Sequence, residues 1–162
     1  MKDKKTIWAF VSMAVILFNG QAEGQKLDYE FLYKIELALE PGIELGQTPV
    51  GKRVIYQVKG GTFAGPKLKG KVRPIGGDWV LRLDSTTTKL DVKLLLETED
   101  GQLISNTYAG IVKTHTDGTT YWRIAPVFET SSKKYEWLNY VTAVGVGGFA
   151  PGGVSYEVYA IK

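Results

Sequence analysis

The sequence predicts an all-β protein, a single antiparallel up-and-down β-barrel of about eight to nine strands with lipocalin-like architecture. From Leu27 to Leu39, apolar and polar residues alternate with a period of two, which is typical of a strand with one buried face. The pattern recurs to the end of the chain, with glycine, proline and aspartate turn signals between the segments. Strands joined in series favour a meander, and closure into a barrel removes its exposed edges.

The expected strands follow one another without a linker or an internal repeat. They cover residues 27–39, 52–59, 67–73, 78–83, 89–98, 102–113, 120–128, 137–146 and 154–161. Asp100-Gly101 and Asp117-Gly118 predict two tight hairpins. Ser131–Leu138 is the one helical candidate, a single turn capped by its first serines. A two-sheet sandwich is the alternative to the barrel.

The first 22 residues have the pattern of an export signal. A basic start, MKDKK, precedes an apolar stretch from Ile7 to Phe18, and Gly20 and Ala22 are the small residues that a signal peptidase requires. The alternative is a membrane anchor, but this stretch is shorter than the roughly 20 residues that span a bilayer. We therefore expect cleavage after Ala22, a β-barrel domain over residues 23–162 and export to the periplasm or the medium, with no stable membrane anchor after cleavage.

Composition excludes several classes of function. The chain has no cysteine, so disulfides, thiolate metal sites and cysteine nucleophiles are ruled out, and His115 is the only histidine. No G-x-S-x-G elbow or calcium-loop motif occurs. The net charge of +3 falls to +1 without residues 1–22, which gives no electrostatic case for a nucleic-acid partner. We expect no metal and no cofactor.

The stretch GPKLKGKV, Gly65–Val72, resembles a phosphate-binding loop in its glycine and lysine spacing. Such a loop carries Ser or Thr after the lysine and opens a helix, whereas here Val72 follows and the residues alternate as in a strand. The glycines are better explained by backbone geometry. We therefore expect no nucleotide site and a solvated ammonium group on Lys71.

The candidate acid–base groups are Asp78, Asp91 and Glu129, which lie beside aromatic or aliphatic strand residues where burial would raise a carboxyl pKa. Each also has a plain structural explanation, respectively as a turn residue, an outward-facing strand residue and a strand-end cap. Arg123 shares a strand face with Tyr121. If that face points inward, the guanidinium needs a carboxylate partner or an anionic ligand, and if it points outward Arg123 is a surface residue.

Aromatic residues are numerous enough to line a pocket or simply to fill a barrel. An eight-stranded barrel is wide enough for either side chains or one small ligand. The aromatic residues in question are Trp79, Trp122, Trp137, Tyr56, Tyr108, Tyr121 and Tyr140.

Four segments resemble the signature of domain-of-unknown-function family 3237, a family of small bacterial and fungal proteins. GGTFAGPKLKGKV followed by GGDW is similar to its G-G-T-F-x-G-P-x-L-x-G-x-V…G-x-D-W motif. LDVKLLLETEDGQLI resembles its central hairpin, YWRIAPVFETSSKKYEWLN its Y-F-R-x-x-P-x-F-E-T…Y-x-W-L-N block, and GGVSYEVYAI its closing strand. The resemblance spans nearly all of residues 27–162 and implies a compact antiparallel β-barrel.

The positions that match the polar and aromatic part of this signature are the candidate ligand-binding residues. They are Asp78, Trp79, Asp91, Arg123, Trp137 and Asn139. The resemblance implies little about activity, and the export signal sets this chain apart from cytoplasmic relatives.

Three hypotheses about function follow. The first is an exported barrel that binds a small apolar or aromatic ligand, with a carbonyl or carboxylate near Arg123. The second is a non-hydrolytic enzyme, an isomerase, cyclase or lyase, in which Asp78 or Asp91 is the acid or base and Arg123 stabilises an oxyanion. The third is a structural barrel with a filled interior and an exposed apolar patch. The sequence indicates neither the ligand nor the oligomeric state.

Overall fold

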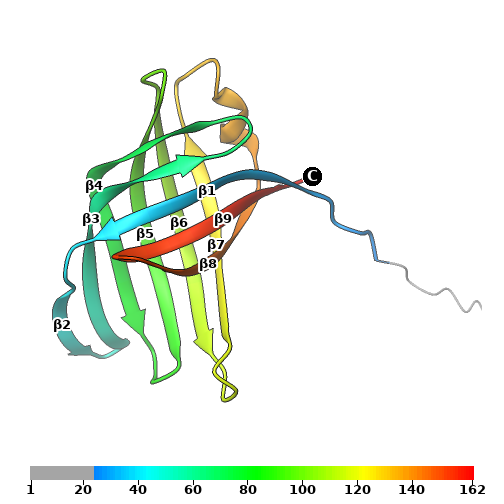
Figure 1. The fold of residues 1–162 in the computed structure, drawn as a ribbon. Coiled ribbons are helices and arrows are strands. Elements are labelled where there is room, and N and C mark those ends of the chain that lie inside the picture. The colour runs from blue at the N-terminus through cyan, green and yellow to red at the C-terminus, as the bar shows by residue number, and fades with distance from the viewer. Residues whose placement is uncertain (1–23) are drawn as a thin grey trace, which may run out of the picture.

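In the computed structural model, which describes residues 24–162, nine strands form one antiparallel sheet that closes on itself (Figure 1). The predicted export signal and its cleavage site lie outside the described residues. The strands are β1 (Tyr29–Leu39), β2 (Ile43–Thr48), β3 (Gly51–Ala64), β4 (Lys69–Arg82), β5 (Thr87–Thr98), β6 (Leu103–Thr114), β7 (Thr120–Glu129), β8 (Ala143–Ala150) and β9 (Gly153–Ile161). A short 3₁₀ helix, η1 (Glu136–Tyr140), lies between β7 and β8.

The barrel closes because β1 pairs with both β9 and β3. The order β1-β9-β8-β7-β6-β5-β4-β3 is therefore a ring of eight strands, and β2 is an extra strand paired with β3 outside the ring. This confirms the predicted barrel and excludes the two-sheet sandwich. In the described part of the chain, no helix is long and apolar enough to cross a membrane.

Two predicted strands, 67–73 and 78–83, are one continuous strand, β4. Pro74 does not end the strand, because the pairing with β5 shifts register between Val72 and Gly76. Such a bulge takes up residues that cannot join the ladder. Gly76 lies at its end with a φ of 109°, a conformation that favours glycine.

The segment after β7 also departs from the prediction, since Trp137 lies in η1 and the strand begins at Ala143. The amide of Leu138 donates to the carbonyl of Tyr135, the i to i+3 bond of a 3₁₀ turn. Residues three apart lie on the same side of such a turn, which explains why Tyr135 and Leu138 are both buried. The two hairpins at Asp100-Gly101 and Asp117-Gly118 are present as predicted.

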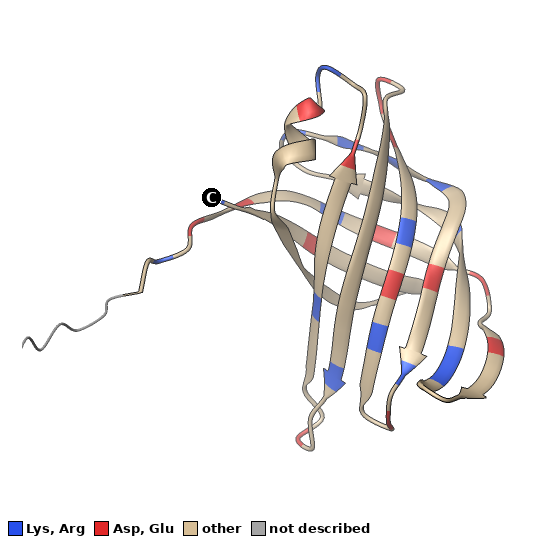
Figure 2. Cartoon of the chain, turned by 180° about the vertical axis from the view of Figure 1, so that it is seen from behind, with Lys and Arg blue, Asp and Glu red and all other residues tan. Residues whose placement is uncertain are grey.

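The stretch Gly65–Val72 forms the β3–β4 turn and the start of β4, and the chain continues as a strand after it. Lys69 and Lys71 are exposed and pair with Glu99 at 2.9 Å and Glu97 at 3.2 Å on the outer surface. Figure 2 shows positively and negatively charged residues interspersed along the strands. Exposed pairs of this kind contribute about 0–1 kcal/mol each to the free energy of unfolding, so they add little to the stability of the barrel.

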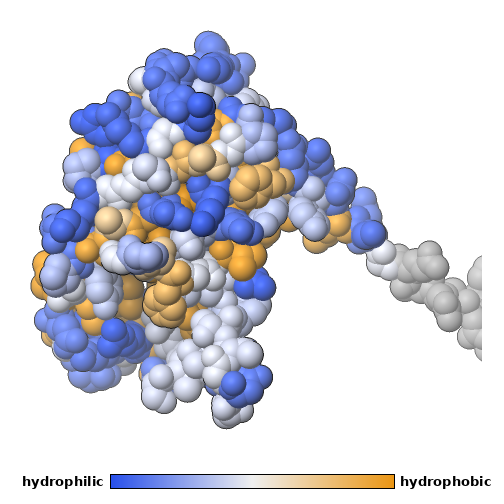
Figure 3. Space-filling view, in the orientation of Figure 1, coloured by the Kyte–Doolittle hydropathy of each residue, from blue (hydrophilic) through white to orange (hydrophobic). Residues whose placement is uncertain are grey.

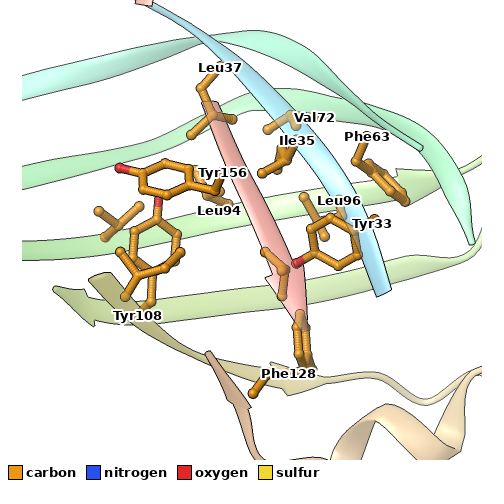
Figure 4. Packing of buried hydrophobic residues seen from close by; sticks show 14 of the residues in the cluster. Tyr33, Ile35, Leu37, Phe63, Val72, Leu94, Leu96, Tyr108, Phe128 and Tyr156 are labelled. Atoms are coloured by element: carbon orange, nitrogen blue, oxygen red, sulfur yellow. The ribbon is translucent and has the colours of Figure 1, made fainter. Parts of the chain in front are cut away.

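Buried side chains line the whole barrel, and they fill one of its ends. At that end Tyr33, Phe63, Leu96 and Phe128 pack together with at most 4% of each side chain exposed (Figure 4). Asn139 ties η1 to the segment that follows β7, because its side chain accepts from the amide of Thr130 at 2.8 Å and donates to the Thr130 carbonyl at 3.0 Å. The opposite end of the barrel is open.

Candidate functional site

The open half of the barrel holds a cavity of about 370 Å³. Figure 3 shows this side of the molecule hollowed, with apolar side chains in the hollow. Most of the wall is aliphatic or aromatic, from the inward faces of strands on all sides of the barrel. The apolar part of the wall comprises Leu37, Leu39, Val58, Val80, Leu90, Val92, Val112, Trp122, Phe149 and Val154. Volumes of this size suit a small organic ligand.

One row of inward-facing residues crosses the cavity wall on four adjacent strands. The Cα partners run from Tyr56 on β3 to Asp78 on β4, then to Val92 on β5 and Tyr108 on β6. All four line the cavity. Because side chains alternate between the two faces of a strand, this register brings one carboxyl and two phenol groups to the same level of the barrel.

Burial in this apolar wall raises the pKa of Asp78 to about 6. Two smaller effects come from Asp91 on the next strand: its backbone amide donates to Oδ1 of Asp78 at 3.1 Å and lowers the pKa, while its negative charge raises it. A carboxyl of this kind is found in both protonation states near neutral pH, which is the condition for efficient general acid–base catalysis.

Tyr108 and Tyr156 lie beside each other at the inner end of the cavity, with ring centroids 5.5 Å apart, and the Tyr108 hydroxyl points toward Tyr156 (Figure 4). Burial raises the pKa of both phenols, and the negative charge of Asp78 raises them further. Both tyrosines therefore stay protonated and can donate hydrogen bonds to a ligand oxygen.

Trp122 lines the cavity beside the pairing of β7 with β8, which is the shortest strand pairing of the barrel. Strands β7 and β8 pair only at Arg123–Val146 and Ile124–Gly145. Beyond this point the rings of Trp122 and Phe149 meet edge to face, with centroids 5.2 Å apart. Phe149 is 82% exposed and also lines the cavity, so it lies at the mouth.

The structure places one of the six candidate ligand-binding residues, Asp78, in the cavity wall. Trp79 and Asp91 face outward on β4 and β5. Arg123 is on the outer face of β7, with its guanidinium 4.7 Å from the Tyr121 ring centroid and Nη1 donating to the Trp122 carbonyl at 2.9 Å. Arg123 and Asp78 are therefore not brought together.

The remaining candidates belong to the closed end or to the outer surface. Trp137 lies in η1 with the Lys67 ammonium 5.5 Å from its ring, and Asn139 makes the backbone contacts described above. Glu129 ends β7 and is exposed, as is His115 at the β6–β7 hairpin. Of the aromatic candidates, Tyr56, Tyr108 and Trp122 line the cavity.

Arg82 and Tyr156 are cavity residues that the sequence reasoning did not single out. A signal for both is present, because Asp78, Val80 and Arg82 alternate on β4, and Tyr156 alternates with the buried Val158 on β9. Across residues 24–162, no three histidine, cysteine, aspartate or glutamate side chains are grouped so that they could hold a metal ion.

The family model described as "Protein of unknown function (DUF3237)" matches residues 27–161. The chain belongs to this family. Among its relatives, the hydroalkoxylation enzyme phnH of Penicillium herquei is 35% identical over 117 residues, covering 72% of this chain and 71% of that protein. A UPF0311 protein of Clostridium acetobutylicum is 25% identical over 152 residues, covering 85% and 96% of the two chains.

Solved structures of similar proteins have the same barrel. A β-barrel-like protein from Acinetobacter baumannii has a TM-score of 0.82 and 34% identity, covering 88% of this chain and all of its own. An enzyme from Penicillium herquei has a TM-score of 0.73 and 28% identity, covering 87% of this chain and 98% of its own. The proteins similar to this chain thus include bacterial proteins and a fungal enzyme.

Proposed function

We propose that the cavity binds a small, largely apolar molecule and that Asp78 transfers protons to and from it in a non-hydrolytic reaction. The observation that carries this proposal is the position of Asp78, a carboxyl group in an apolar cavity wall whose pKa is raised by burial to about 6. Perturbed carboxyls inside a pocket are candidates for catalysis. The reaction class is that of a cyclase, lyase or isomerase.

Asp78 and the two buried tyrosines have complementary roles in this proposal. As a carboxylate, Asp78 accepts a proton from a ligand hydroxyl or an acidic C–H group, and the carboxylic acid then returns the proton to another ligand atom. Tyr108 and Tyr156 donate hydrogen bonds to an oxygen on which negative charge develops. These hydroxyls replace Arg123 as the oxyanion-stabilising groups, because Arg123 lies on the outer face.

The name of the fungal relative suggests one reaction within this class, the addition of an alcohol O–H group across a C=C bond. In such an addition the O–H proton moves to the Asp78 carboxylate as the oxygen forms the new C–O bond. The second alkene carbon then takes a proton from the Asp78 carboxylic acid, which regenerates the carboxylate. The cycle balances without an oxidant, a reductant or a metal.

We also propose that residues 1–22 direct export, so that the barrel works in the periplasm or the medium. The basic start, the apolar stretch and the small residues before Glu23 support this. No nucleic acid or protein partner is part of the proposal.

The test uses protein purified natively from its host and three forms of the chain: wild type, Asp78→Asn and Asp91→Asn. Each form is incubated in D₂O with a small-molecule extract of the host, and mass spectrometry follows new products. We expect wild type and D91N to form a product that carries carbon-bound deuterium. D78N should be at least about 100-fold slower.

Two outcomes contradict the proposal in different ways. Equal deuterium incorporation by D78N and wild type would exclude Asp78 as the proton-transfer group. A small molecule that co-purifies with the wild type but is never converted would leave a binding protein without catalysis, which is the alternative to the enzyme.

A further inference from the structure

The cavity mouth carries a second functional group, the guanidinium of Arg82. Arg82 follows Asp78 and Val80 on the inward face of β4, four residues beyond Asp78, and it lines the cavity. At about 3.3 Å per residue, the two Cα atoms are roughly 13 Å apart along the strand. The cavity therefore has an acid–base group inside and a cation at its entrance.

Among residues 24–162, the guanidinium of Arg82 forms no ion pair, although Glu44, whose pKa is lowered chiefly by Lys52, also feels its charge, and Glu40 lines the same cavity. Across residues 24–162, no Asp or Glu oxygen lies within 4.0 Å of it, and the nearby carboxylates have other partners: Glu44 pairs with Lys52 at 2.8 Å and Glu40 with Lys59 at 3.6 Å. Its one hydrogen bond to a described residue runs from Nη2 to the Tyr56 hydroxyl at 3.3 Å. Arginine has five N–H donors in a fixed fork, so most of them are available to a ligand.

Thr88 contributes a second hydroxyl group to the cavity wall on the strand next to Arg82. Thr88 on β5 is the Cα partner of Arg82 and also lines the cavity, while Tyr56 approaches from β3 on the other side. A guanidinium with available donors, next to strands that carry hydroxyl groups in the same wall, can bind a carboxylate, a phenolate or a sulfonate.

We propose that Arg82 binds an anionic group of the ligand at the cavity mouth. The ligand class is then an elongated apolar acid whose charged end stays at the entrance while its reacting end reaches Asp78. This proposal rests on the proposed function, because it assumes that the cavity is occupied. The orientation follows from charge: an anion at the inner end would be desolvated beside the Asp78 carboxylate, whereas an anion at the mouth meets Arg82 and keeps part of its hydration.

The experiment compares two fluorescent probes with the same aromatic skeleton. N-phenyl-1-naphthylamine is neutral, and 1-anilinonaphthalene-8-sulfonate carries one negative charge. We expect wild-type protein to bind the sulfonate more tightly than the neutral probe. Arg82→Gln should weaken sulfonate binding about tenfold, corresponding to about 1.4 kcal/mol, and leave neutral-probe binding unchanged. Arg82→Lys should retain part of the preference, and added salt should weaken it.

Arg123→Gln is the matched control, since it removes the same charge from the outer face of β7, and it should alter neither affinity. Leu90→Trp fills the cavity wall and should abolish binding of both probes, which shows that they bind inside. The inference is overturned if the sulfonate binds no tighter than the neutral probe, or if R82Q weakens both equally. Failure of the neutral probe to bind wild type would instead count against the proposed function, so the two failures are distinguishable.

Discussion

The Oδ1 atom of Asp78 accepts a hydrogen bond from the backbone amide of Asp91 at 3.1 Å, although the two carboxyl groups lie on opposite sides of the barrel wall. Asp78 faces the apolar cavity, where burial raises its pKa to about 6, and Asp91 faces solvent. Two aspartates on neighbouring strands therefore differ in chemistry because of the face on which each lies. They provide a matched pair for mutation.

Asp78→Asn should stabilise the protein in a pH-dependent manner. The folded pKa of about 6 lies above the usual 3.8, so the wild type has its full stability below the usual value and loses part of it as the pH rises through 6. Asparagine stays neutral and keeps an oxygen for the Asp91 amide. Above pH 6, D78N should have a free energy of unfolding higher by on the order of 1–3 kcal/mol, and below pH 4 the two proteins should be similar. Urea unfolding at a series of pH values measures this difference.

Asp91→Asn is the control for that experiment, because the Asp91 side chain is exposed. This substitution should change the free energy of unfolding by no more than about 0.5 kcal/mol at any pH. If the free energies of unfolding of D78N and the wild type changed with pH in parallel, the surroundings of Asp78 would not be disfavouring its ionised form.

Leu90→Trp should block the cavity without unfolding the barrel. Leu90 lines the cavity, and an indole directed into about 370 Å³ of open space meets few atoms. We expect loss of N-phenyl-1-naphthylamine binding and a change in unfolding free energy below about 2 kcal/mol. Lys93→Trp, which adds the same group to the outer face of β5, should leave binding intact. Probe binding by folded L90W at wild-type affinity would place the probe elsewhere.

Tyr33→Phe should leave the protein equally or more stable. The Tyr33 side chain is fully buried, and its hydroxyl has no hydrogen-bond partner among residues 24–162. Removing an unsatisfied buried hydroxyl should raise the free energy of unfolding by on the order of 1 kcal/mol. Tyr159→Phe is the control, since that exposed hydroxyl donates to Glu157 at 2.8 Å. Strong destabilisation by Y33F in urea unfolding would contradict this assignment.

Gly147→Ala should displace Trp122 from the cavity wall. A Cβ atom at Gly147 would lie 2.5 Å from Cδ1 of Trp122, whereas one at Gly148 would have no heavy atom within 4 Å. We expect G147A to alter the near-ultraviolet circular dichroism of tryptophan and to weaken neutral-probe binding several-fold. G148A should match the wild type. Identical spectra for the two variants would show that Trp122 does not depend on close packing with β8.

The fold could be predicted from the sequence because alternation and turn residues are local signals. The hairpins at Asp100-Gly101 and Asp117-Gly118 lie where the residues indicate, whereas Pro74 falls in a bulge that depends on pairing with β5. The bulge is a property of two strands, and the residues around Pro74 alone do not reveal it.

The site was harder to predict because a period of two does not say which face is inside. Asp78 and Trp79 are adjacent and both match the family signature, yet only Asp78 lines the cavity. Arg123 and Arg82 each alternate with apolar neighbours. Which face of a strand is the inner one is fixed only when β1 closes the sheet by pairing with β3 and β9, and Arg82 lies on that inner face. The proposed functional set, Asp78 and Arg82 with Tyr108 and Tyr156, comes from three different strands that only the closed barrel brings together.

The most direct test of the central claim is the pKa of the Asp78 carboxyl group, measured by ¹³C NMR with D78N to assign the resonance. We expect a pKa of about 6 in the free protein, because the carboxyl is buried in an apolar wall. The pKa should rise further when N-phenyl-1-naphthylamine fills the cavity and removes more water from the carboxyl. A pKa at or below the usual 3.8, unchanged by the probe, would contradict the assignment of Asp78 as the acid–base group of a ligand-binding cavity.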